Sequence, residues 1–181
     1  MNHIIISNNS YLRKGLISSL RLSNTDSLWC CIDLDYCNSL NEIYSALSTK
    51  IITSRHLVLF LGNNSIYIQL LNPLHPVRMN DSHCKVLRYF NENKGVTVEL
   101  AKEFITSLKQ LDRFTLREKN LCTLLAKLDI KEVARLEGLS IKSIYGIKYR
   151  LAKTLHITNQ IHFKLFLCNE INKITNIFLQ A

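Results

Sequence analysis

The stretch between Leu139 and Leu155 carries four basic residues and no acidic one. The basic residues are Lys142, Lys148, Arg150 and Lys153. Cations at this density can bind the phosphates of a nucleic acid, and a basic helix fits into the groove between two phosphate strands. The stretch therefore indicates a DNA-binding helix. The alternative is a solvated face of an ordinary helical bundle, which the charges alone do not exclude.

The residues before and within this stretch predict how it is positioned. Ala134, Gly138, Ile144 and Ile147 follow one another at spacings of four, six and three residues. Two short helices that cross steeply need this series, because a small alanine allows close approach and a glycine can adopt the positive φ of a tight turn. The spacing therefore predicts a helix-turn-helix, and it favours DNA binding over the solvated bundle.

Capping signals support these two helices and predict a third one before them. Thr115 with Glu118, and Asp129 with Glu132, have the spacing of reciprocal capping boxes, and Ser140 stands where the last helix needs an N-cap. Each signal marks a helix start independently of the apolar pattern. The turn is thus predicted from both sides.

The basic helix is expected to have two faces. Ile144, Ile147, Leu151 and Leu155 recur at helical spacing and predict a buried stripe. On the opposite face, Lys142, Tyr145, Gly146 and Tyr149 are expected to point at base edges, whereas Lys148, Arg150 and Lys153 are expected to meet phosphates. The predicted DNA-binding residues are Lys142, Ser143, Tyr145, Gly146, Lys148, Tyr149, Arg150 and Lys153.

Residues 114–155 resemble the DNA-binding domain of LuxR/FixJ-type regulators. The matching residues are Phe114-Thr115-Leu116-Arg117-Glu118, Leu124-Leu125-Ala126, Lys131-Glu132-Val133-Ala134, Ser140, Ser143-Ile144 and Leu155. Departures from the family pattern are a shorter connection after Ala126 without its glycine, and Tyr145, Ile147 and Thr154 where lysine, histidine and lysine are common. The runs Ala134-Arg135-Leu136-Glu137 and Ser143-Ile144-Tyr145 are most similar to enterobacterial fimbria and capsule regulators. The resemblance implies a four-helix DNA-binding domain over residues 114–181.

The first 108 residues predict an α/β domain with a parallel sheet. Apolar runs at residues 3–7, 28–34, 57–61 and 77–80 have the length of buried strands. Between and after them, capping and apolar spacing predict helices that begin at Ser10, Ser39, Ser65 and near Asp81 or Ser82, and one over residues 98–108. A hairpin return strand at residues 65–71 is the alternative to the third of these helices. The expected domains are 1–108 and 114–181, joined by a short linker at 109–113.

This α/β unit resembles a degenerate receiver domain. A working receiver needs an aspartate at the end of a central strand, an acidic pair after the first strand to hold Mg²⁺, and a lysine on a late strand. Asp33 matches the phosphoacceptor position. However, Ser7-Asn8-Asn9 offers no carboxylate, residues 77–80 offer no lysine, and too few residues precede the strand with Asp33 for a complete set of strand–helix pairs. Asp33 is therefore interpreted as a strand-end or capping residue, with no phosphorylation site predicted.

The composition suggests a nucleic-acid partner and no catalysis. Of the net charge of +9, most lies in residues 111–181, which hold twelve Lys/Arg against six Asp/Glu. The six cysteines form no CxxC pair and no metal-ligand spacing with histidines. No catalytic residue, metal or cofactor is predicted, and an enzyme that uses Cys30-Cys31 with His56 is the least favoured hypothesis. No apolar run has the length of a membrane span, so a cytoplasmic protein is expected.

The sequence thus predicts a transcriptional regulator that binds double-stranded DNA, as a homodimer and without phosphorylation. Apolar faces at residues 98–108 and 161–179 are the candidate dimer interfaces. One alternative is a co-regulator that acts by heterodimerising with another LuxR-type protein and binds DNA weakly alone. Another is a phosphorylation-driven response regulator, which rests on Asp33 alone.

Overall fold

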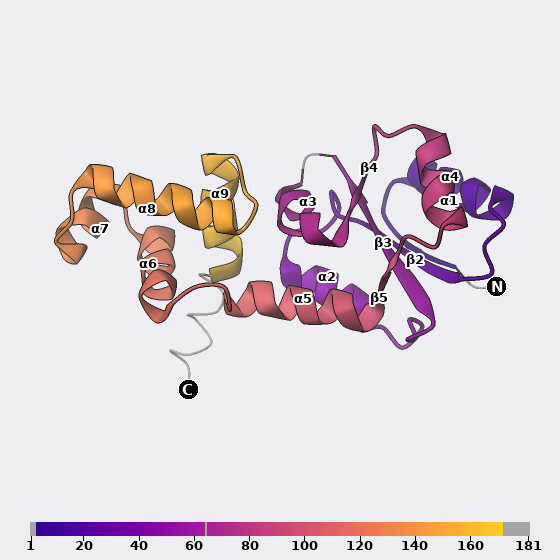
Figure 1. Ribbon diagram of the computed structural model, residues 1–181, viewed down its shortest axis with the longest axis horizontal. Coiled ribbons are helices and arrows are strands. Elements are labelled where there is room, and N and C mark those ends of the chain that lie inside the picture. Colours follow the sequence, from indigo (N-terminus) through magenta and orange to yellow (C-terminus); the bar gives the residue numbers. More distant parts are fainter. Residues whose placement is uncertain (1–2, 64, 172–181) are drawn as a thin grey trace. The chain divides into compact units, whose positions relative to one another are not determined.

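The computed structural model describes residues 3–63 and 65–171, and the chain divides into two compact units (Figure 1). The N-terminal unit comprises Met1–Ile105 and the C-terminal unit Thr106–Ala181. In the described part of the chain, no helix combines the length and the apolar character needed to cross a membrane.

The N-terminal unit is built on a five-stranded sheet. Its strands are β1 (Ile4–Ile6), β2 (Leu28–Asp33), β3 (His56–Gly62), β4 (Val77–Arg78) and β5 (Val96–Thr97). The order β1-β2-β3-β4 is parallel throughout, whereas β5 pairs antiparallel with the first half of β3. β2 and β3 are buried along almost their whole length, as expected for apolar central strands that are covered on both faces.

Helices lie on both sides of this sheet. They are α1 (Ser10–Leu22), α2 (Leu40–Leu47), α3 (Ile66–Leu70), a 3₁₀ turn (Asn72–Leu74) and α4 (His83–Asn91), followed by α5 (Val98–Gln110). Figure 1 shows α1 and α4 on one side of the sheet, and α2 and α3 on the other. Leu16 of α1 and Phe90 of α4 join Trp29 of β2 in one core cluster. The rings of Trp29 and Phe90 meet edge to face with centroids 4.9 Å apart, so the single tryptophan anchors this unit.

The predicted strands and helices of this unit are confirmed, with three corrections. The cap of α1 is Asn9, whose side chain accepts from the Tyr11 and Leu12 N–H groups, rather than Ser10. The sheet is not purely parallel, because β5 pairs antiparallel with β3, and this short strand was not predicted. Finally, α5 runs to Gln110, so the first two residues of the predicted linker are helical. The exact domain limits stay a prediction.

The C-terminal unit is helical. It contains α6 (Leu116–Lys127), α7 (Ile130–Glu137), α8 (Ile141–Thr154) and α9 (Gln160–Phe166), which continues into a π-helical turn (Leu167–Ile171). The predicted capping boxes at Thr115 and Asp129 are both present. Part of the predicted apolar face at residues 161–179, from residue 172 on, lies outside the described residues. Over the part of this unit that the structure describes, up to residue 171, the expected four-helix organisation is confirmed.

Candidate nucleic-acid interface

The turn between α7 and α8 has the geometry that the sequence predicted. Gly138 ends α7 with φ = 65°, and its N–H donates to the carbonyls of Ala134 and Arg135. No atom lies within 4 Å of the place where a Cβ would stand, so the backbone conformation rather than space requires the glycine. The Leu139 N–H also donates to the Ala134 carbonyl, at 3.0 Å. The end of α7 is therefore closed tightly before α8 begins.

α8 starts at a side-chain cap and is held by an apolar stripe. The Ser140 hydroxyl accepts from the Ser143 N–H at 3.0 Å and lies 2.8 Å from the Ser143 hydroxyl. Ile144, Leu151 and Leu155 are fully buried, and Ile147 is half-buried. On α7, Val133 and Ala134 are buried in turn, and a small residue at this position lets the two helices approach closely. The predicted inward face of α8 is confirmed.

The opposite face of α8 is exposed, and it carries cations and aromatic rings but no carboxylate. It consists of Lys142, Tyr145, Gly146, Tyr149 and Lys153. Tyr145 and Tyr149 are 55% and 61% exposed. Nothing lies within 4 Å of a Cβ at Gly146, so the backbone there is open to close approach. We call these five residues the exposed face of α8.

The other predicted DNA-binding residues lie elsewhere on α8. Arg150 is exposed, but its guanidinium stands 3.4 Å from the carboxylate of Glu118 at the start of α6. Lys148 is half-buried and lines a hollow within the unit. Ser143 takes part in the cap. Of the eight predicted residues, the structure therefore brings five together on one exposed face and gives the other three a contact or position inside the unit.

Asp33 of the N-terminal unit is buried and hydrogen-bonded. It is 5% exposed at the end of β2. The Ser7 hydroxyl donates to its Oδ2 at 2.6 Å, and the Asp35 N–H donates to its Oδ1 at 3.1 Å. A serine directly after β1 thus faces Asp33, at the place where a working receiver needs acidic residues. The interpretation of Asp33 as a strand-end residue agrees with these contacts.

Sequence reasoning missed the part played by Asp35. Its carboxylate accepts from the N–H groups of Asn63 at 2.8 Å and Ser65 at 3.0 Å, and so ties the loop after β2 to the loop after β3. The Asp-Leu-Asp spacing of residues 33–35 was the available signal. Among the residues that the structure describes, no three histidine, cysteine, aspartate or glutamate side chains gather in a way that could hold a metal ion. Both aspartates therefore have structural partners at this edge of the sheet.

The sheet unit followed by a helix-turn-helix unit is a fold that this chain shares with solved structures of response regulators. Solved structures agree over nearly the whole chain. The response regulator RcsB in complex with DNA has a TM-score of 0.58 at 19% identity, with 93% of this chain and 98% of that chain covered. RcsB from Salmonella enterica serovar Typhimurium, bound to the promoter rprA, has a TM-score of 0.64 at 16% identity with the same coverage. No protein-family model matches the chain, and no curated protein matches it significantly. The two-domain fold predicted from the sequence is confirmed.

Proposed function

We propose that this protein is a sequence-specific regulator of transcription that binds double-stranded DNA through α8. The observation that carries the proposal is the exposed face of α8, which combines two cations, two tyrosines and a glycine without one carboxylate. Buried side chains on its other face pack inside the unit, and the turn at Gly138 fixes how the helix follows α7. A helix held in this way can enter a major groove, where its side chains reach base edges and phosphates.

The similar solved structures support this proposal. Three of them hold RcsB on DNA, and one of these three contains two RcsB dimers bound to two parallel DNAs. One recognition helix reads only a few base pairs, so a two-fold pair of protomers would read two half-sites. Our proposal therefore includes a dimer on DNA. In that arrangement Lys153 and Arg150 contact phosphates, and Arg150 leaves Glu118 to do so, whereas Lys142 lies with the tyrosines at base edges.

Regulation in this proposal does not use phosphorylation of Asp33. The Asp33 carboxylate is enclosed by Ser7 and the Asp35 N–H, and β4 ends on Arg78 rather than a lysine. Phosphoryl transfer to a carboxylate needs Mg²⁺ and a cation to offset the charge that develops in the transition state. Without an acidic pair after the first strand to hold that metal, the N-terminal unit serves protein contacts rather than chemistry.

A co-regulator that needs a second LuxR-type protein is the alternative function. The positions of Lys148 and Arg150 favour it, because one faces a hollow and the other pairs with Glu118. Lys142 and Lys153 are then the cations of α8 left to bind DNA, which limits the affinity of a single protomer for DNA.

The test is selection of binding sites from a random duplex pool with the full-length protein, followed by titration of the selected duplex at several salt concentrations. We expect enrichment of a two-fold symmetric site, a complex of two protomers by light scattering, and affinity that falls steeply with salt. Enrichment only after a second LuxR-type protein is added would support the co-regulator. No enrichment in either case would refute both functions.

Incubation with acetyl phosphate and Mg²⁺ is expected to leave the mass of the protein unchanged, because Asp33 is buried and lacks a metal site. Intact-mass spectrometry is the measurement, with a functional receiver protein treated in parallel as the positive control. An adduct of about 80 Da on the native chain that is absent from an Asp33→Asn variant would contradict the proposed mechanism.

A further inference from the structure

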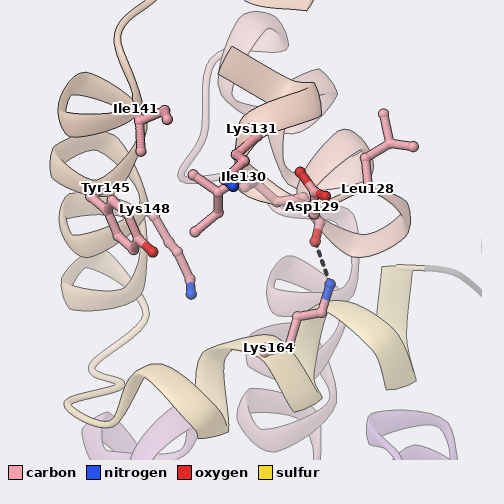
Figure 2. A pocket seen from close by; sticks show the side chains of 9 residues that line it. Leu128, Asp129, Ile130, Lys131, Ile141, Tyr145, Lys148 and Lys164 are labelled. Atoms are coloured by element: carbon pink, nitrogen blue, oxygen red, sulfur yellow. Dashed lines mark hydrogen bonds between the residues drawn. The ribbon is translucent and has the colours of Figure 1, made fainter. Parts of the chain in front are cut away.

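A hollow of about 500 Å³ lies inside the C-terminal unit, between the α6–α7 connection, α8 and α9 (Figure 2). It is lined by Leu125, Leu128, Asp129, Ile130, Lys131, Ile141, Tyr145, Lys148 and Lys164. Figure 2 shows Tyr145 and Lys148 extending from α8 toward the hollow, with Ile130 opposite them and Lys164 below. The volume is that of a site for a small organic molecule, which typically occupies about 300–1,000 Å³.

The polar side of this hollow is cationic. Three lysines line it against one carboxylate, Asp129, whose Oδ1 already accepts from the Glu132 N–H at 2.9 Å. Lys164 is engaged as well, because its ammonium donates to the Leu125 carbonyl at 2.8 Å. Lys148 has neither a hydrogen bond nor an ion pair to any residue that the structure describes. The half-buried ammonium of Lys148 is therefore available to bind an anion.

The surroundings of Lys148 disfavour its charge in the absence of such an anion. Burial lowers the pKa of the Lys148 ammonium, and the positive charge of Lys164 lowers it further. An anion seated between these two lysines would reverse both effects, because it compensates the lost hydration and screens one ammonium from the other. The electrostatics of the hollow thus favour a negatively charged occupant over a neutral or cationic one.

The remaining walls are apolar. Leu125, Leu128, Ile130 and Ile141 contribute aliphatic groups, and Tyr145 contributes the face or edge of its ring. A lone inorganic ion would leave these walls wet, whereas a molecule with one acidic group and an apolar body would cover them. The lining therefore matches an amphipathic acid.

We propose that this hollow binds a small amphipathic anion, with its acidic group on Lys148 and its apolar body against Ile130, Ile141 and Tyr145. A carboxylate, a sulfonate or a phosphate ester would satisfy the same contacts. The binding does not depend on DNA recognition. Its consequence does rest on the proposed function: Tyr145 belongs to both the hollow and the exposed face of α8, so an occupant would fix the position of a side chain that reads DNA.

The test is a fluorescence titration of the full-length protein with anilinonaphthalene sulfonate, an aromatic anion of suitable size. We expect saturable binding of one molecule per chain, and displacement by decanoate. Lys148→Met keeps the aliphatic stem and should weaken the probe by about tenfold or more, as the loss of a charged hydrogen bond requires. Lys148→Arg should retain binding of the probe. Lys142→Met removes a cation outside the hollow and should leave the affinity for the probe unchanged.

Three results would overturn the proposal. One is equal affinity of the native protein and the Lys148→Met variant, when both have the same circular dichroism. Another is binding that does not saturate. The third is displacement of the probe by random duplex DNA but not by decanoate, which would assign Lys148 to a DNA phosphate. None of these measurements requires sequence-specific DNA binding. The probe titration therefore tests the hollow even if the proposed function is wrong.

Discussion

Replacing Ile144 with Ala is expected to destabilise the C-terminal unit by about 2–5 kcal/mol, the usual cost of removing a large aliphatic side chain from a packed core. Ile144 has no exposed surface and lies on the face of α8 that is packed in the unit. Domains are commonly stable by only about 5–15 kcal/mol. The loss is therefore large enough to loosen α8, and DNA binding should weaken with it.

The two units can be followed separately in this experiment. The only tryptophan, Trp29, is buried in the N-terminal unit, so its fluorescence reports unfolding of that unit, whereas far-ultraviolet circular dichroism reports helices of both. Urea titration should shift the helical transition and leave the tryptophan transition in place. Ile141→Ala is the matched control, since the same change is made on the same helix where the side chain is 44% exposed. Equal destabilisation by both variants would refute the inward position of Ile144.

The C-terminal unit could be predicted closely because its signals are local. A capping box needs two residues three positions apart, and a positive-φ glycine marks the turn by itself, as Asp129, Glu132 and Gly138 show. The inward stripe of α8 follows from one helical period. In the N-terminal unit, the apolar runs that became β2 and β3 were long enough to identify a central sheet, and α3 was correctly preferred to a hairpin strand.

What the sequence did not reveal depends on pairs of residues that are distant in the chain. β5 has only two residues, and it exists because Val96 and Thr97 meet the start of β3. A Cβ at Gly95 would come within 2.7 Å of Leu57 and Trp29, which lie far from it in the chain. The Ser7–Asp33 hydrogen bond joins the residue after β1 to the end of β2. Each depends on tertiary packing, which periodicity does not encode.

The roles of Lys148 and Arg150 show the same limit within one helix. A helical wheel places both beside the exposed face, where they were expected to meet phosphates. Arg150 instead pairs with Glu118, thirty-two positions earlier in the chain, and Lys148 faces a hollow whose other wall includes α9. The direction of a flanking side chain is thus decided by the neighbouring helices. The assignment of both residues to DNA stays a prediction.

Replacing Tyr149 with Ala is expected to cost about 1–3 kcal/mol of binding free energy at the selected DNA site and little on random DNA. The Tyr149 ring is 61% exposed on the face opposite Ile144. Its hydroxyl can hydrogen-bond to a base edge, and its ring can contact a thymine methyl group. Tyr145→Ala should behave in the same way. Fluorescence anisotropy with the selected and a scrambled duplex measures the difference.

Lys153→Ala should behave differently, because a lysine that contacts a phosphate carries no sequence information. We expect it to weaken binding to both duplexes alike and to reduce the dependence of log K on log salt by about one unit.

Tyr11→Ala is the matched control for the tyrosines, since Tyr11 is an 84% exposed ring on α1 in the other unit. If the Tyr149 variant lost the selected and scrambled duplexes equally while its circular dichroism stayed native, base reading by the exposed face of α8 would be wrong. The tyrosine would then act only as part of a general surface for phosphates.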